Sequence, residues 1–95
     1  MAAYMIADIE VHDPAIYDEY RKQVKATIDQ YGGRFLVRGG AHELLEGEAD
    51  IHRTVVLEFP SMEALKRWYH SPEYAPLIAL RKKAARGHLF AVEGA

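Results

Sequence analysis

The chain has 95 residues, a length that accommodates one domain with a single core. Hydrophobic residues make up 49% of it and charged residues 27%, which is typical of a globular domain and argues against disorder. The formal net charge is -2, which does not favour nucleic-acid binding. There is no cysteine, and this excludes disulfides, thiolate catalysis and cysteine-bound zinc.

The local charge pattern and the N-terminus give two further expectations. Arg81, Lys82, Lys83 and Arg86 cluster near the end of a predicted helix, where they complement the helix dipole and stay solvated. The N-terminal residues have no basic region and carry an acid within the apolar run, unlike a signal peptide. No stretch approaches membrane-spanning length. We therefore expect a cytoplasmic protein with no membrane partner.

The first half of the chain predicts a strand, a helix and a second strand. Residues 4–11 alternate and place Met5, Ala7 and Ile9 on one face. Asp13 is a suitable N-cap with Pro14 at the first helical position, and the helix runs to about residue 31, before a Gly-Gly pair. Residues 34–38 form the second strand, which the glycines at 39 and 40 break or bulge.

The second half predicts two strands around a broken helix. Residues 42–46 can continue the second strand as an edge segment, and residues 53–59 form the third strand. Ser61 caps a helix that carries Trp68 and Tyr69, and Ser71-Pro72 interrupts it. Pro72 can start another helix that runs to about residue 85. Gly87 then ends it, and residues 88–93 form the last strand.

The order of these elements predicts the fold. A β-α-β-β-α-β sequence of this length fits a single ferredoxin-like α+β domain over residues 1–95, with an antiparallel four-stranded sheet and helices on one face. The other face would carry Ile6, Val56, Leu36 and either Phe90 or Leu89, which is too apolar to remain in water. Because most oligomers are two-fold symmetric, we expect a homodimer with two sheets packed face to face.

Several segments resemble a known family. Residues 31–40, Leu45-Glu-Gly47, residues 53–61 and the run Trp68-Tyr-His-Ser-Pro-Glu-Tyr74 are similar to the bacterial domain-of-unknown-function 1330 family, over nearly the whole chain. Residues 25–30 depart from it by lacking a proline at the helix end. The resemblance implies the dimeric α/β-barrel superfamily, which includes antibiotic-biosynthesis-type monooxygenases, haem-degrading enzymes, muconolactone isomerases and small stress-response proteins. It implies no particular reaction.

Strand alternation also brings four charged residues to one face. If the apolar sets of the strands meet the helices, then Asp8, Arg34, Arg38 and Glu58 all point to the opposite face. One interpretation is a salt-bridge network at the dimer interface, since buried charges must be paired. The other is a pocket in which an arginine holds a carboxylate or enolate and a carboxylate of the chain moves a proton.

A second candidate group follows the interrupted helix. Trp68 has the spacing of a core residue, whereas Tyr69 and Tyr74 carry phenols that can reach a cavity on the sheet face as donors. Ser71 is better explained as a helix cap than as a nucleophile. The five histidines show no metal-binding spacing, so no metal site and no cofactor is predicted.

Three hypotheses about function follow. The first is a cofactor-free enzyme that acts on a small acidic or carbonyl compound. Its candidate catalytic residues are Asp8, Glu58 and Tyr69, and its candidate ligand-binding residues are Arg34, Arg38, Trp68 and Tyr74. The second is a non-catalytic dimer that binds a small ligand, and the third is a purely structural dimer.

Overall fold

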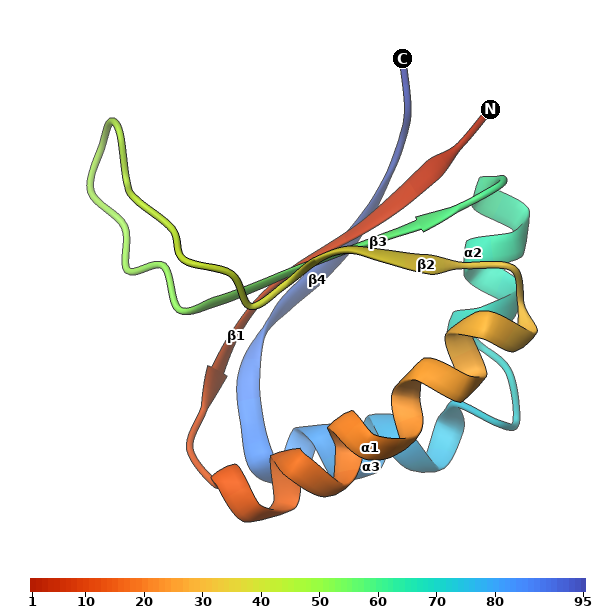
Figure 1. Cartoon of the computed structure of the whole chain (residues 1–95), viewed down its shortest axis with the longest axis horizontal. Coiled ribbons are helices and arrows are strands. Elements are labelled where there is room, and N and C mark those ends of the chain that lie inside the picture. The colour runs from red at the N-terminus through yellow and green to blue at the C-terminus, as the bar shows by residue number, and fades with distance from the viewer.

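The computed structural model describes all residues, 1–95, as one sheet covered by helices on one face (Figure 1). The sheet has four antiparallel strands in the order β2-β3-β1-β4. In chain order the elements are β1 (Ala3–Val11), α1 (Pro14–Gln30), β2 (Arg34–Arg38), β3 (Arg53–Phe59), α2 (Met62–Tyr69), α3 (Ala75–Ala84) and β4 (Ala85–Glu93). This is the predicted ferredoxin-like α+β fold, with the second helix divided in two.

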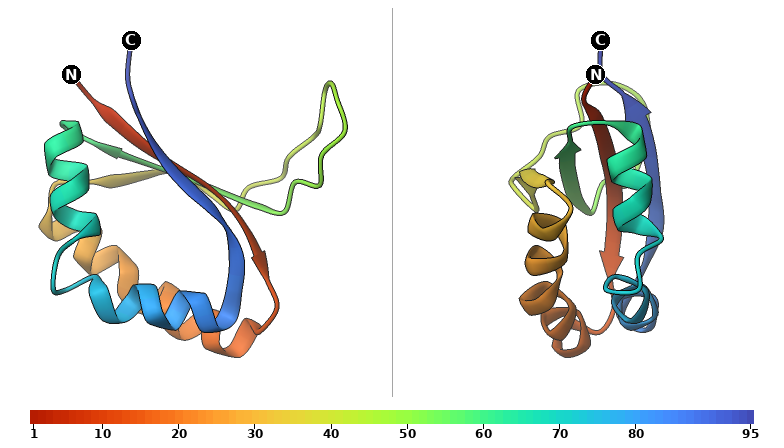
Figure 2. Two further views of the ribbon diagram at one scale, coloured as in Figure 1. Left: turned by 180° about the vertical axis from the view of Figure 1, so that it is seen from behind. Right: turned by 90° about the vertical axis from the view of Figure 1, so that its right-hand side faces the viewer.

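The core lies between the sheet and the helices. Along β1, residues 3, 5, 7 and 9 are buried and residues 4, 6, 8 and 10 are partly exposed, as strict alternation predicts. The helices place an aromatic group against this face, in which the Trp68 and Tyr74 ring centroids lie 4.1 Å apart. Figure 2 shows the resulting two layers, with α1 and α3 running side by side beneath the sheet. We call the helix-free side of the sheet its outer face.

Capping side chains begin α1 and α2 where the sequence predicts. The Ile16 amide donates to Asp13 Oδ1 at 3.2 Å, and Pro14 occupies the first turn, where its missing N–H costs nothing. The Ala64 amide likewise donates to Ser61 Oγ at 3.1 Å. At the far end of α1, Gly32 has a φ of 80°, a conformation that glycine adopts without a side-chain penalty.

Two predicted boundaries in the C-terminal third are wrong. Helix α3 begins at Ala75 and not at Pro72, because Ser71 Oγ accepts from the Tyr74 amide and donates to the Trp68 carbonyl, which holds residues 71–74 in a turn. Strand β4 begins at Ala85 and not at His88, so Gly87 lies inside it. A side chain at this glycine would collide with the main-chain oxygen of Asp8 on β1.

The link between β2 and β3 also differs from the prediction. Residues 42–46 form no strand, and the whole segment 39–52, which we call the arm, extends away from the body of the domain (Figure 1). Its backbone is tied to the sheet at both ends. The Gly39 amide donates to the Thr54 carbonyl at 2.8 Å, and the His52 amide donates to Asp8 Oδ1 at 2.9 Å.

A bulge in β2 changes which of its side chains face the helices. Phe35 pairs with Leu57, but the next pairs are Val37 with Val56 and Arg38 with Val55. Because paired residues share a face, the extra residue moves Val37 to the outer face and Arg38 to the helix face. The prediction that Arg38 shares the outer face with Asp8, Arg34 and Glu58 is therefore wrong.

Candidate functional site

A cavity lies between the sheet and the helices α1 and α3. Its volume is about 30 Å³, and eleven of its fifteen lining residues are hydrophobic. Strands supply one wall, including Met5 and Leu57, and Val24 and Ile28 of α1 supply the other. Because a water molecule needs roughly 10–15 Å³ of such volume, the cavity has room for about two waters.

The four remaining lining residues are all arginines, and no carboxylate lines the cavity. Arg21 belongs to α1, Arg38 ends β2, Arg53 begins β3, and Arg81 lies on α3. Arg21 pairs with Asp18 at 3.3 Å on the surface, whereas the other three form no ion pair with any carboxylate. We call this site the arginine cavity. It concentrates positive charge on a chain whose net charge is -2.

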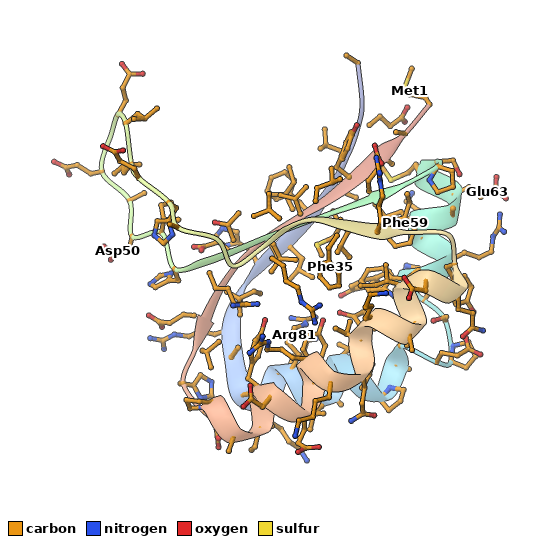
Figure 3. The ribbon with its side chains drawn as sticks, viewed as in Figure 1. Met1, Phe35, Asp50, Phe59, Glu63 and Arg81 are labelled. Atoms are coloured by element: carbon orange, nitrogen blue, oxygen red, sulfur yellow. The ribbon has the colours of Figure 1, made fainter.

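Two of the guanidinium groups have a buried nitrogen without a partner. The Nε atoms of Arg53 and Arg81 are shielded from solvent and form no hydrogen bond. Arg81 is only 8% exposed, and Figure 3 shows it reaching from α3 into the space between helices and sheet, below Phe35. A buried N–H without an acceptor costs about 1–3 kcal/mol, and more when it is charged. These two N–H groups can therefore donate to an acceptor that the chain itself does not supply.

Aromatic rings hold two of these side chains in place. The Arg38 guanidinium lies 4.3 Å from the centroid of the Phe35 ring, and its Nη2 donates to the main-chain oxygen of Arg21 at 3.2 Å. Arg53 lies 5.7 Å from the Tyr17 ring. Both distances are within the range of a cation–π contact. Arg38 is exposed and spans from β2 to α1, so its side chain closes one side of the cavity.

A pair of buried phenols completes the polar part of this region. Tyr20 lines the cavity, and its hydroxyl lies 2.8 Å from that of Tyr74. Burial raises the pKa of both phenols above the ordinary value, which favours their neutral form. Burial alone would lower the pKa of Arg81, but the nearby oxygens of Tyr74 and Tyr20 raise it. The site therefore offers fixed positive charge and neutral hydroxyls and contains no carboxylate or histidine base.

The other predicted charged residues lie on the outer face, in two separate places. Arg34 pairs with Glu58 at 2.6 Å, and the Tyr4 hydroxyl donates to the same carboxylate at 3.3 Å. Glu58 pairs with Tyr4 of β1, and Asp8 lies four residues further along that strand. Four residues of a strand span about 13 Å. The structure thus brings Arg34 and Glu58 together, but it places Asp8 apart from them.

Asp8 instead belongs to a cluster that fixes the end of the arm. His52 Nδ1 lies 3.3 Å from Asp8 Oδ2, and its Nε2 lies 3.1 Å from Glu10 Oε2. The hydrogen bond from the His52 amide is the main reason that the pKa of Asp8 is lowered. A hydrogen bond from Arg86 lowers the pKa of Glu10 in the same way. No group of three or more histidine, aspartate or glutamate side chains is arranged to hold a metal ion.

The predicted aromatic residues lie in and beside the core. Trp68 and Tyr74 are fully buried, and Trp68 Nε1 donates to Thr27 Oγ1 at 3.0 Å. Tyr69 is partly exposed and borders a second hollow, between α2 and β4. Neither Trp68 nor Tyr74 lines the arginine cavity, although the Tyr74 hydroxyl forms a hydrogen bond with Tyr20, which does line it.

Sequence reasoning missed three arginines and two tyrosines of the arginine cavity as site residues: Arg21, Arg53, Arg81, Tyr17 and Tyr20. Arg81 was expected in a solvated basic cluster, and this is wrong, although Lys82, Lys83 and Arg86 are exposed. Leu77, Arg81 and Ala84 recur at four- and three-residue spacing and form the buried stripe of α3. An arginine on an otherwise apolar stripe is the signal that could have identified it.

Comparison with known proteins places this fold in a family. The sequence model of a protein family, the domain of unknown function DUF1330, matches residues 2–95. The chain belongs to the DUF1330 family. This agrees with the family resemblance seen in the sequence. No curated protein matches the chain.

Solved structures share the fold at low sequence identity. A protein of unknown function from Rhodopseudomonas palustris, RPA0582, is 18% identical with a TM-score of 0.77, over 99% of this chain and 82% of that one. SnoaB, a cofactor-independent oxygenase from Streptomyces nogalater, is also 18% identical, with a TM-score of 0.67 over 99% and 93%. HapK from Hahella chejuensis is 21% identical, with a TM-score of 0.65 over 98% and 92%. None of the helices is long and apolar enough to span a membrane.

Proposed function

We propose that this DUF1330 protein binds a small organic anion in the arginine cavity. The observation that carries the proposal is the pair of buried Nε atoms, on Arg53 and Arg81, that have no acceptor. Three guanidinium groups without a carboxylate partner line the same cavity and repel one another. An anion would accept from the free donors and remove that repulsion.

The composition of the cavity favours an anion with an apolar body. Its charged groups are all cationic, while most of its wall is hydrocarbon or aromatic. A carboxylate, an enolate or a phenolate meets the guanidinium donors, and the remainder of the molecule contacts residues such as Phe35 and Val24. Arg38, held to α1 by one hydrogen bond, can swing outward to admit it.

Binding of carboxylates by isothermal titration calorimetry tests this proposal. Benzoate should bind the wild-type protein, and Arg81→Met should weaken binding about tenfold or more, because a charge-assisted hydrogen bond contributes roughly 1.5–3 kcal/mol. The control is Arg34→Met, which removes an arginine from the outer face, where it pairs with Glu58. If benzoate does not bind, or if both variants weaken it equally, the arginine cavity is not an anion site.

A cofactor-free oxygenase is the second candidate, and the fold shared with SnoaB supports it. Guanidinium groups stabilise a substrate as its phenolate or enolate, which is the electron-rich form that reacts with dioxygen. Asp8 and Glu58 lie on the outer face, so they are poorly placed as bases for this cavity. Oxygen consumption with 1-naphthol or acetylacetone, lost in Arg81→Met, would support catalysis. Binding without turnover would favour the non-catalytic alternative.

We also propose that the protein is a homodimer that buries its outer face. Leu36, Phe90 and Val92 are 46%, 53% and 43% exposed on one chain, and Phe90 pairs with Ile6 across β1 and β4. Such a contiguous apolar surface is seldom left in water. Phe90→Asp should yield a monomer in size-exclusion chromatography with light scattering. A wild-type monomer would contradict the proposal.

A further inference from the structure

A second hollow lies on the helix side of the sheet, between β4 and α2. Its volume is about 250 Å³, several times that of the arginine cavity, and it opens to solvent. Leu65 and Tyr69 of α2 line one side, and Leu89 and Ala91 of β4 line the other. Lys66 and His70 are its other polar residues, and no carboxylate lines it. We call it the β4–α2 hollow.

Two residues, Met5 and Leu89, line both the β4–α2 hollow and the arginine cavity. Met5 pairs with Ala91 and Leu89 pairs with Ala7, so their side chains are diagonal neighbours on the helix face of β1 and β4. They form the partition between the two spaces. Methionine is unbranched and adapts readily to its surroundings, and Leu89 is only partly buried, so a change of side-chain rotamer at these two residues would join the two spaces.

The sizes of the two spaces complement each other. While Arg38 closes it, the arginine cavity has room for about two waters, which is enough only for the head of an organic anion. Ligand pockets commonly measure about 300–1,000 Å³, and the β4–α2 hollow supplies most of the volume that an organic ligand needs. The two spaces also differ in polarity. The arginine cavity holds the guanidinium donors, whereas most residues that line the β4–α2 hollow are apolar.

We infer that the two spaces form one slot, and that the ligand is an elongated amphipathic anion such as a medium-chain carboxylate. Its head binds Arg53 and Arg81, and its apolar chain passes between Met5 and Leu89 into the β4–α2 hollow. This inference rests on the proposed anion site. It adds that the length of the apolar chain selects the ligand, and that the ligand enters beside the edge strand β4.

A series of straight-chain carboxylates tests the inference by calorimetry. Affinity should rise from butyrate to decanoate by roughly threefold to fourfold per added methylene, the value for burying one CH₂ group. Ala91→Trp should fill the hollow from an exposed position, weakening decanoate binding at least tenfold and butyrate binding less than twofold. The control is Ala41→Trp, on the exposed arm, which should change neither.

A second measurement needs no variant. With ¹³C-methyl methionine, decanoate should shift the Met5 signal much more than butyrate does. Met62, which lines neither space, and the exposed Met1 serve as internal references. This keeps the test valid if the tryptophan variant does not fold.

The outcomes separate this inference from the function on which it rests. If no carboxylate binds at all, the proposed anion site fails. If butyrate binds but affinity does not change with chain length and Met5 does not respond, the anion site stands and the joined slot is wrong. If Ala91→Trp changes the oligomeric state and leaves decanoate binding intact, the hollow is a contact for a second copy of the chain, which also overturns the inference.

Discussion

The hydroxyl oxygens of Tyr20 and Tyr74 lie 2.8 Å apart in the core, and they join α1 to the turn that precedes α3. Tyr74 is fully buried and Tyr20 is 8% exposed, so neither hydroxyl has ready access to water as an alternative partner. The pair sits beside the arginine cavity. It therefore fixes the relative position of the two helices that supply Arg21 and Arg81.

Removing one of these hydroxyls should destabilise the protein. Tyr74→Phe leaves the Tyr20 hydroxyl buried without its partner, and we expect the free energy of unfolding to fall by about 1–3 kcal/mol. The double variant Tyr20→Phe/Tyr74→Phe should lose less stability than the sum of the two single changes, because it leaves no buried hydroxyl without a partner. Urea denaturation measures both, with Tyr69→Phe as control. Additive losses would show that the two hydroxyls do not depend on each other.

Replacing Arg81 should have the opposite effect on stability. The buried Nε–H of Arg81 has no acceptor, and an apolar side chain of similar length removes that cost, so Arg81→Met should raise the free energy of unfolding by about 1–3 kcal/mol in ligand-free protein. The same variant should lose anion binding. Arg34→Met, at the exposed pair with Glu58, should change stability by less than about 1 kcal/mol. If Arg81→Met instead lowers the free energy of unfolding, the contacts of the Arg81 side chain stabilise the fold, and the prediction is wrong.

Local patterns predicted the fold well because its signals are local. The alternation along β1 and the caps at Asp13 and Ser61 depend on neighbouring residues, and all three have the predicted form. The same alternation placed Arg34 and Glu58 on the outer face. Whether these side chains have any functional role remains a prediction.

The residues of the arginine cavity were not predicted to lie together, because the signals that place them there are not local. The bulge between Phe35 and Val37 is set by pairing with β3, and one extra residue moved Arg38 to the other face of the sheet. Arg81 belongs by sequence to a basic cluster, yet packing of α3 against the sheet buries it while its neighbours stay in water. Only the tertiary structure brings Arg38, Arg53 and Arg81 to one cavity.

Two glycines on either side of β2 should respond differently to a methyl group. A Cβ at Gly33 would lie 2.5 Å from Phe59 Cε1 and 2.9 Å from Ile28 Cγ2, within the core, so Gly33→Ala should cost about 1–3 kcal/mol. A Cβ at Gly40 would meet nothing within 4 Å, and Gly40→Ala should be neutral or slightly stabilising. Thermal unfolding compares them directly. Equal effects would mean that the core relaxes around the added methyl group.

The lowered pKa of Asp8 predicts how stability depends on pH. In the folded protein the carboxylate accepts from the His52 amide, which favours its charged form and brings its pKa below the ordinary value of 3.8. The unfolded chain then binds the proton more readily than the folded one, so stability falls as the pH falls. The contribution of Asp8 is complete well above pH 3.8 and is lost as the pH drops through the folded pKa.

Asp8→Asn isolates this contribution, because it keeps an oxygen at the same place and removes the charge. We expect wild-type protein to be more stable than Asp8→Asn at pH 6, and the difference to shrink between pH 4 and pH 2.5. Urea denaturation at these pH values measures it, with Asp18→Asn, on the exposed face of α1, as control. A difference that stays constant down to pH 2.5 would mean that the carboxylate charge does not hold the end of the arm.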